Sequence, residues 1–285
     1  MLSTKEIATL LNQSEGYLYN LASRMPRLVH KSKRKKKSGG FRNITSPDKE
    51  LKQILRLINE KVFEQFHLHQ FLFLQPGRSH IKMLSQFVGM KFLITADIDD
   101  FYPSIYPKMM MSTLKKLGFD DSAAKLLTRL TTMDFVLPQG FPTSPKIAAL
   151  TLNPVLIRLA GLAQKEKFLV GLYADNLVIG SSFGPQRFHN LFVKIFRQQG
   201  FLLDEFKVYC DCSPREVMGI RINSRLEVEP SYIKNVVQEI ETLKQETNKK
   251  GSTGILKSIK GKIRYIEYVN SMQAAILKKM IIGLT

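Results

Sequence analysis

Cysteine, acidic residues and long apolar segments are all scarce in this sequence of 285 residues. The two cysteines, Cys210 and Cys212, are too close for a structural disulfide and have no nearby histidine to complete a zinc site. No apolar run approaches the roughly 20 residues that are needed to cross a membrane. The N-terminal residues also lack the pattern of a signal peptide, in which a basic segment is followed by an apolar one. We therefore expect a cytoplasmic protein without a membrane partner.

The charge balance is strongly basic. Lys and Arg number 43 against 24 Asp and Glu, which gives a net charge of +19 and a pI near 9.9. Such a protein usually binds a polyanion, most often nucleic acid, although charge can also serve solubility alone. The basic excess lies mostly in residues 30–40 and after Ser231, whereas Asp97, Asp99 and Asp100 form an acidic centre. This arrangement suits a protein that binds phosphates around divalent cations.

The hydrophobic pattern predicts an α+β fold. Residues 46–66 have the periodicity of a helix, and we expect Ser46 as its N-cap and Pro47 at its first position. Its apolar residues predict a core-facing surface: Leu51, Ile54, Leu55, Ile58, Val62 and Phe63.

Further along, strands and helices alternate. Residues 91–105 predict a strand that runs into acidic residues, and 135–160 a Pro/Gly-rich loop followed by a helix. Residues 167–182 and 216–229 predict hairpins, the first with Ala-Asp-Asn at its tip. After Pro230 the chain reads as a small basic helical domain with a turn at 247–254.

Two aspartates, Asp97 and Asp175, each lie near the end of a predicted strand. If the strands are antiparallel neighbours, the carboxylates converge, and carboxylate oxygens suit Mg²⁺. Two such ions can stabilise both the attacking and the leaving oxygen of a phosphoryl transfer. Strand-end aspartates are also ordinary turn residues.

The order of three motifs resembles the reverse transcriptases, especially the bacterial retron and group II intron branch. They are Asp-Ile-x-x-Phe-Tyr-x-Ser-Ile at 97–105, Leu-Pro-Gln-Gly-x-Pro-Thr-Ser-Pro at 137–145 and Tyr-Ala-Asp at 173–175. Weaker likenesses to the same branch lie at 36–47, 77–79, 200–207 and 217–223.

The resemblance implies a right-hand polymerase. Its fingers would occupy 1–90, its palm with remaining fingers elements 91–229, and its helical thumb 230–285. The implied activity is RNA-directed DNA polymerase, which copies a structured noncoding RNA into DNA from dNTPs, in antiphage defence and with a possible effector protein as partner.

The resemblance also assigns roles to residues. The catalytic residues would be Asp97, Asp175 and Asn176, which with the main-chain carbonyl of Ile98 would hold two Mg²⁺ ions, or Mn²⁺. The nucleotide would be bound by Lys37, Arg42, Phe101, Tyr102, Gln139 and Lys207. The primer and template would be bound by Met218, Gly219, Ile220, Lys257, Lys260, Lys262 and Arg264. Tyr102 would exclude the ribose 2′-hydroxyl and so select deoxynucleotides.

Asn176 departs from the family, which usually has a second aspartate here. At an effective dielectric near 20 the missing charge is worth on the order of 2–3 kcal/mol to a nearby cation. An RNA-binding scaffold with a weakened active site is therefore one alternative. A template-independent or protein-primed polymerase, as in abortive-infection relatives, is another.

Two features also differ from retron enzymes: 82–87 lacks their Asn-Ala-x-x-His, and Val217-Met218-Gly219 replaces Val-Thr-Gly.

Overall fold

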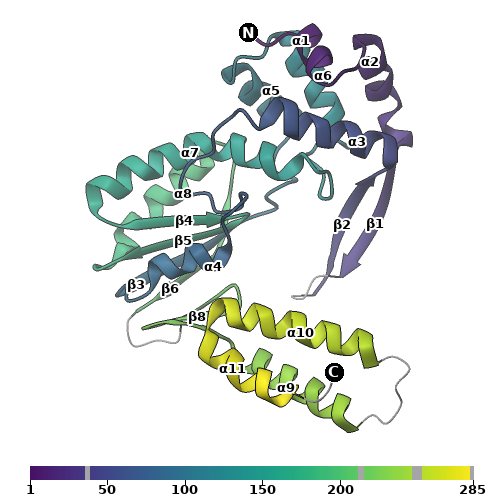
Figure 1. Cartoon of the computed structure of the whole chain (residues 1–285). Helices are drawn as coiled ribbons and strands as arrows, with labels where there is room; N and C mark the ends of the chain where they lie inside the picture. The colour runs from purple at the N-terminus through teal and green to yellow at the C-terminus, as the bar shows by residue number, and fades with distance from the viewer. Residues whose placement is uncertain (36–38, 211–214, 246–251, 283–285) are drawn as a thin grey trace.

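The computed structural model describes residues 1–35, 39–210, 215–245 and 252–282, and it has the predicted α+β composition (Figure 1). The helices are α1 (Thr4–Leu10), α2 (Glu15–Arg24), α3 (Lys49–Leu57), α4 (His80–Leu84), α5 (Pro107–Lys116), α6 (Asp121–Thr131), α7 (Ser144–Glu166), α8 (His189–Arg197), α9 (Pro230–Gln245), α10 (Ser252–Val269) and α11 (Ser271–Met280). The strands are β1 (Val29–Lys35), β2 (Phe41–Pro47), β3 (Phe92–Ile98), β4 (Leu169–Tyr173), β5 (Asn176–Ser181), β6 (Leu203–Tyr209), β7 (Glu216–Val217), β8 (Ile220–Ile222) and β9 (Leu226–Val228). The predicted turn at 247–254 lies largely outside the described residues.

The central sheet has the strand order β4-β5-β3-β6 and is antiparallel throughout. Two glycines let α4 and the residues after it pack closely on the sheet. A Cβ at Gly171 would lie 2.5 Å from Met83 Cγ, and one at Gly180 would lie 2.6 Å from a ring carbon of Phe87. Helices α7 and α8 also pack beside the sheet (Figure 1). This sheet is the predicted palm.

The β1–β2 hairpin and the helices around α3 form the predicted fingers (Figure 1). The apolar face predicted for 46–66 is buried, as expected. The predicted N-cap, however, was wrong. Strand β2 continues through Pro47, which pairs with Val29, and α3 begins only at Lys49. The cap is Asp48, whose carboxylate accepts a 2.9 Å hydrogen bond from the N–H of Leu51.

Helices α9, α10 and α11 form the predicted thumb, and α9 begins at Pro230, as the sequence indicates (Figure 1). Their apolar side chains share a core with the small β7-β8-β9 sheet and with α4. An aromatic contact also joins thumb and palm, because the His80 ring lies 5.4 Å from that of Tyr173 and 6.3 Å from that of Tyr265. The division of the chain at 230 stays a prediction.

Helix α7 corrects one expectation. By length and composition alone, Ser144–Glu166 is apolar enough to cross a membrane, so the prediction that no segment approaches this was wrong. Just over half of its most apolar window is buried inside the fold. The apolar side chains of α7, among them Ile147, Leu152 and Leu159, belong to the main core. The core helix of a folded protein has the same composition as a membrane span.

Candidate active site

The sheet brings Asp97 and Asp175 to one edge of the palm. Asp97 lies near the end of β3, directly across from Asn176, the first residue of β5. Asp175 occupies the two-residue turn between β4 and β5, and its main-chain carbonyl accepts a 2.8 Å hydrogen bond from the N–H of Ile98. Antiparallel pairing thus joins residues that are almost 80 positions apart in the sequence.

The turn that carries Asp175 has an unusual backbone. Ala174 has a φ of 54°, in the left-handed region that residues with a Cβ rarely adopt. Strained backbone of this kind is found at functional sites, where the surrounding structure holds it. Here the paired strands β4 and β5 hold it on both sides, through the Tyr173–Asn176 pair.

The Asn176 side chain orients the Asp175 carboxylate. Its Nδ2 donates a 2.8 Å hydrogen bond to Asp175 Oδ1. An ionised aspartate at this position could not donate, and it would repel its neighbour. Asn176 therefore fixes one carboxylate while it leaves the site one negative charge short of the usual family pattern.

Asp97 lies in a crowded acidic environment. Burial, together with the charges of Asp175, Glu205 and Asp204, raises the pKa of its carboxyl from 3.8 to about 6, whereas the charge of Lys207 opposes this shift. A divalent cation would relieve this repulsion, and the carboxylate and amide oxygens suit Mg²⁺. Within the described ranges, no three His, Cys, Asp or Glu side chains form a complete ligand cluster. Substrate phosphates and water would have to complete the coordination, as is usual for Mg²⁺.

The two aromatic residues after the acidic cluster have different positions. Phe101 is buried, with its ring 5.2 Å from that of Tyr102 and 6.1 Å from that of Phe201, so its side chain belongs to the core. Burial raises the pKa of Tyr102, and the negative charge of Asp175 adds to the shift while Arg42 opposes it. Charges of both the acidic edge and the fingers hairpin therefore act on the Tyr102 hydroxyl.

The Pro/Gly-rich loop joins the fingers to the palm. The N–H of Thr45 in β2 donates a 2.8 Å hydrogen bond to the main-chain oxygen of Gln139. At the next residue, Gly140, φ is 120° and a Cβ would lie 2.6 Å from the Thr45 oxygen, so no side chain fits there. Within the described part of the chain, Gln139 Oε1 is buried without a hydrogen-bond partner, which is costly unless a ligand supplies a donor.

Strand β6 contributes charges that the sequence motifs alone did not assign. Asp204 lies across from Asp97, and the register shifts at this point, where Glu205 has a φ of 49°. Lys207 Nζ lies 3.0 Å from Glu205 Oε2, and its charge acts on Asp97. The acidic pair within Leu-Asp-Glu-Phe-Lys at 203–207 was the signal that could have found Asp204 and Glu205.

The predicted primer-binding residues form a tight turn. Met218 and Gly219 connect β7 to β8 with φ values of 52° and 75°. Ile220 is fully buried in the thumb core, so only its main chain could reach a primer.

The predicted basic residues of α10 divide into two groups. The side chains of Lys257, Lys260 and Arg264 are exposed. Lys262 Nζ instead pairs with the carboxylate of Glu239 in α9, and this contact holds the two helices together. Lys37, predicted in the fingers, lies outside the described residues.

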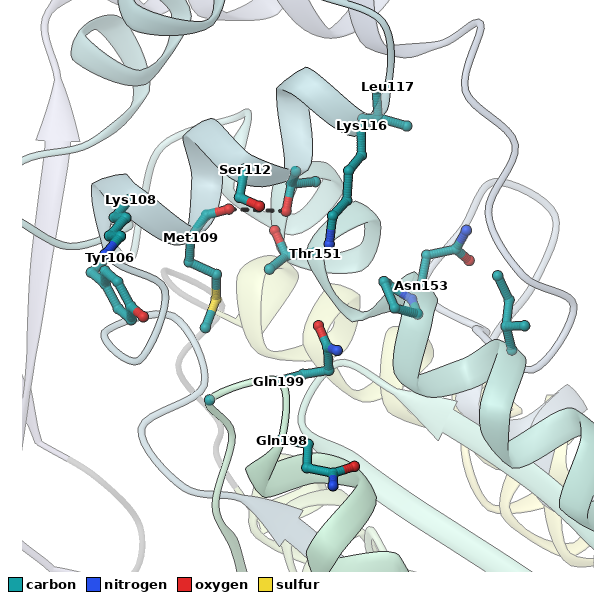
Figure 2. A pocket seen from close by; sticks show the side chains of 14 residues that line it. Tyr106, Lys108, Met109, Ser112, Lys116, Leu117, Thr151, Asn153, Gln198 and Gln199 are labelled. Atoms are coloured by element: carbon teal, nitrogen blue, oxygen red, sulfur yellow. Dashed lines mark hydrogen bonds between the residues drawn. The ribbon is translucent and has the colours of Figure 1, made fainter.

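A cavity of about 440 Å³ lies apart from all of these residues (Figure 2). It is bordered by α5, by α7 and by the segment before β6, and its lining includes Ser112, Lys116, Asn153 and Gln199. None of the predicted site residues lines it.

Comparisons with known proteins agree with these motifs. Residues 33–205 match the profile of the reverse transcriptase (RNA-dependent DNA polymerase) family. The chain is similar to the retron Ec86 reverse transcriptase of Escherichia coli, with 24% identity over 64% of this chain and 59% of that protein. It is also similar to the retron Mx65 reverse transcriptase of Myxococcus xanthus, with 26% identity over 84% of this chain and 61% of that protein. The chain thus spans about three fifths of the length of these relatives.

A solved structure supports the fold. The telomerase of Candida albicans, determined in complex with a TWJ fragment of telomeric RNA, matches with a TM-score of 0.55 and 13% identity. The match covers 88% of this chain and 56% of that one. Together with the family profile, it confirms the predicted right-hand polymerase fold.

Proposed function

The chain belongs to the reverse transcriptase family, and from this we propose that it is an RNA-directed DNA polymerase whose chemistry takes place at the Asp97–Asp175 edge of the palm. The observation that carries the proposal is that strand pairing brings Asp97 and the turn with Asp175 together at one end of the sheet. The charges of Asp175 and of Arg42 in the fingers both act on Tyr102. A primer 3′-hydroxyl would attack the α-phosphate of a dNTP, and pyrophosphate would leave.

Each residue has a role that its position supports. Asp97, Asp175, Asn176 and the Ile98 carbonyl would hold two Mg²⁺ ions, for which Mn²⁺ can substitute. When bound, these ions neutralise phosphate charge and lower the pKa of the attacking hydroxyl. The hydrogen bond from Asn176 keeps the Asp175 carboxylate in one orientation before the substrate arrives.

The nucleotide would lie between the fingers and the palm. Arg42 and Lys37 would bind the triphosphate, and a guanidinium can do so with two parallel hydrogen bonds. Tyr102 would occupy the space of a ribose 2′-hydroxyl, and the buried Gln139 Oε1 would accept from the nucleotide. Lys207, beside Asp97, would stabilise the leaving pyrophosphate. Phe101 would support Tyr102 from the core.

The basic residues and the tight turn would bind the duplex. Met218 and Gly219 would position the primer end, while Lys257, Lys260 and Arg264 would contact phosphates. By likeness to the retron enzymes, the template would be a structured noncoding RNA, and the role would be antiphage defence in the cytoplasm, with an effector protein as a possible partner.

Primer extension on an annealed RNA template tests the proposal. The parent and Asp97→Ala would be compared with dNTPs and with rNTPs, in Mg²⁺ and in Mn²⁺. We expect extension with dNTPs in the parent and none in Asp97→Ala. If neither the parent nor Asn176→Asp extends any primer while both bind RNA, the scaffold alternative replaces the polymerase.

A further inference from the structure

A tight turn at residues 133–136 carries an unusual aromatic side chain. The main chains of Met133 and Val136 exchange two hydrogen bonds of 2.9 and 3.0 Å, so only Asp134 and Phe135 form the loop. Both loop residues have positive φ, 49° and 62°. This combination is the type I′ geometry, for which Asp-Gly is a preferred sequence and a bulky second residue is unfavourable.

Packing does not explain the phenylalanine. The Phe135 side chain is 84% exposed, so it contributes little to the core. Glycine at 135 would suit the backbone better, and loss of the exposed ring would not lower the stability of the fold. A residue that disagrees with its local structure without a packing gain indicates a functional constraint.

The turn lies against the fingers hairpin. Asp134 Oδ2 is 2.6 Å from Lys31 Nζ of β1. Between the turn and the hairpin is a hollow of about 370 Å³, whose lining includes Lys31, Lys33, Asn43 and Asp134. Figure 1 shows the segment between α6 and α7 reaching toward β2. Phe135 follows Asp134 directly, so its main chain lies one residue from this hollow.

The strand register defines which side chains share a face of the hairpin. Lys31 pairs with Thr45, Lys33 with Asn43 and Lys35 with Phe41. Paired residues in an antiparallel ladder point to the same side, and alternate residues point to opposite sides. We call the face that carries Lys31, Lys33, Lys35, Phe41, Asn43 and Thr45 the outer face.

The outer face is separate from the Asp97–Asp175 edge of the palm. Arg42, which acts on Tyr102, belongs to the opposite face of the hairpin. The outer face combines lysines with a second exposed aromatic ring, because Phe41 is 66% exposed. Phe41 and Phe135 therefore lie near opposite ends of a row of lysines. Flat rings on which bases stack, next to cations that bind phosphates, are how proteins bind single-stranded nucleic acid.

We propose that the outer face together with Phe135 binds a single-stranded stretch of RNA. A base stacks on Phe135, a second base stacks on Phe41, and Lys31 and Lys33 contact the phosphates between them. The proposal deepens the proposed function, on which it rests for the identity of the strand as the unpaired part of the template RNA.

Equilibrium binding with the full chain tests the proposal. Fluorescence anisotropy would measure the Kd for two labelled primer–template duplexes, one blunt and one with an unpaired 5′ template extension. The variants are Phe135→Gly, which suits the turn, and Phe135→Tyr, which keeps a ring. The matched control is Tyr19→Ala, because Tyr19 is an exposed aromatic residue on α2.

We expect Phe135→Gly to raise the Kd for the extended duplex about five- to tenfold, in line with one lost stacking contact. Its Kd for the blunt duplex should equal that of the parent, and its Tm should not fall below that of the parent. Phe135→Tyr and Tyr19→Ala should bind both duplexes with the Kd values of the parent. Equal weakening on both duplexes, an unchanged Kd for the extended duplex, or a lower Tm in Phe135→Gly would overturn the proposal.

Primer extension distinguishes this outcome from failure of the proposed function. If the parent extends primers but Phe135→Gly binds the extended duplex like the parent, the function stands and the outer face has another partner, such as a protein. If the parent does not extend primers but discriminates the extended duplex through Phe135, single-strand binding stands without the polymerase.

Discussion

The proposed catalytic edge of the palm, at Asp97 and Asp175, and the basic surfaces of the fingers and thumb hold their charges in opposite ways. Asp97 and Asp175 are fixed by strand register, by main-chain hydrogen bonding and by the amide of Asn176. Lys257, Lys260 and Arg264 are exposed on a helix face. Chemistry on one phosphate requires placement of each group, whereas binding of a regular polyanion requires mainly charge density. Substitutions should therefore be severe at the edge and graded on the basic surfaces.

The largest effect is expected at the edge itself. Asp97→Ala should lower the rate of dNTP addition at least about a thousandfold, or ~4 kcal/mol of transition-state stabilisation. Asp99→Ala is a matched control, because Asp99 is an exposed acidic residue two positions further on. Single-turnover primer extension measures both. A similar loss in the two variants would contradict the special role of Asp97.

Tyr102 tests whether the palm also selects the sugar. Tyr102→Ala should reduce the preference for dNTPs over rNTPs about ten- to a hundredfold, because it removes the bulk next to the expected 2′ position. Tyr106→Ala, a half-exposed tyrosine outside the site, should keep the preference. The ratio of kcat/KM values for the two nucleotides is the measurement. An unchanged ratio would assign sugar selection to another residue.

Substitutions at Asn176 separate the effect of charge at this position from the effect of its hydrogen bond on the orientation of the Asp175 carboxylate. Asn176→Asp should lower the Mg²⁺ concentration needed for half-maximal activity about tenfold or more, since it adds one charge worth ~2–3 kcal/mol. Asn176→Ala should lower activity without this gain, because it removes the hydrogen bond to Asp175. Magnesium titrations of primer extension compare the three proteins. Equal magnesium requirements would place position 176 outside the metal site.

The thumb should respond in small steps. Lys257→Ala, Lys260→Ala and Arg264→Ala should each weaken duplex binding a fewfold and reduce the slope of log K against log salt by about one. Lys262→Ala should change the slope less and lower the Tm, because Lys262 is paired with Glu239. Salt titrations of duplex affinity separate the two groups. A full slope change in Lys262→Ala would show that its ion pair opens when nucleic acid binds.

The smallest effect concerns stability without metal. The folded protein holds the Asp97 proton more tightly than the unfolded chain, since burial and neighbouring carboxylates raise its pKa to about 6. This group therefore favours folding at low pH, and its contribution is lost as the pH rises from about 4 through about 6. Without divalent ions, Asp97→Asn should have a higher Tm than the parent at pH 8, and this difference should shrink toward pH 4. Thermal melts in a chelator test this, and a constant difference would contradict it.

Much of the candidate site was predictable because it depends on local patterns. The strand around Asp97, the hairpin around Asp175 and the buried face of 46–66 follow from hydrophobic periodicity. Ser46 failed as a cap because β2 pairs with Val29 through Pro47, which is a tertiary contact. Strand β1 was missed for a similar reason. Its lysine-rich sequence has no apolar alternation, and it forms a strand through pairing with β2.

Other features could not be read from residue types alone. The sequence showed Asn176 as a loss of charge, but its hydrogen bond to Asp175 required coordinates. Arg215 resembles a surface residue in the sequence, yet it is buried and donates to the main-chain oxygens of Met90, Lys91 and Cys210. Phe101 and Tyr102 are adjacent and similar, and only the fold shows that the Phe101 ring is buried while the charges of Asp175 and Arg42 act on Tyr102.

Gly140 has a consequence for how this chain can vary. Gly39 and Gly40 need only a left-handed backbone and have open space around them, so asparagine could replace either one. At Gly140 the space itself is closed by the Thr45 oxygen. A library of random variants should therefore accept asparagine at 39 and 40 and reject every change at 140. In such a library, one methyl group at 140 would move the fingers hairpin, and with it Arg42, away from the palm although every charged residue of the sequence was unchanged.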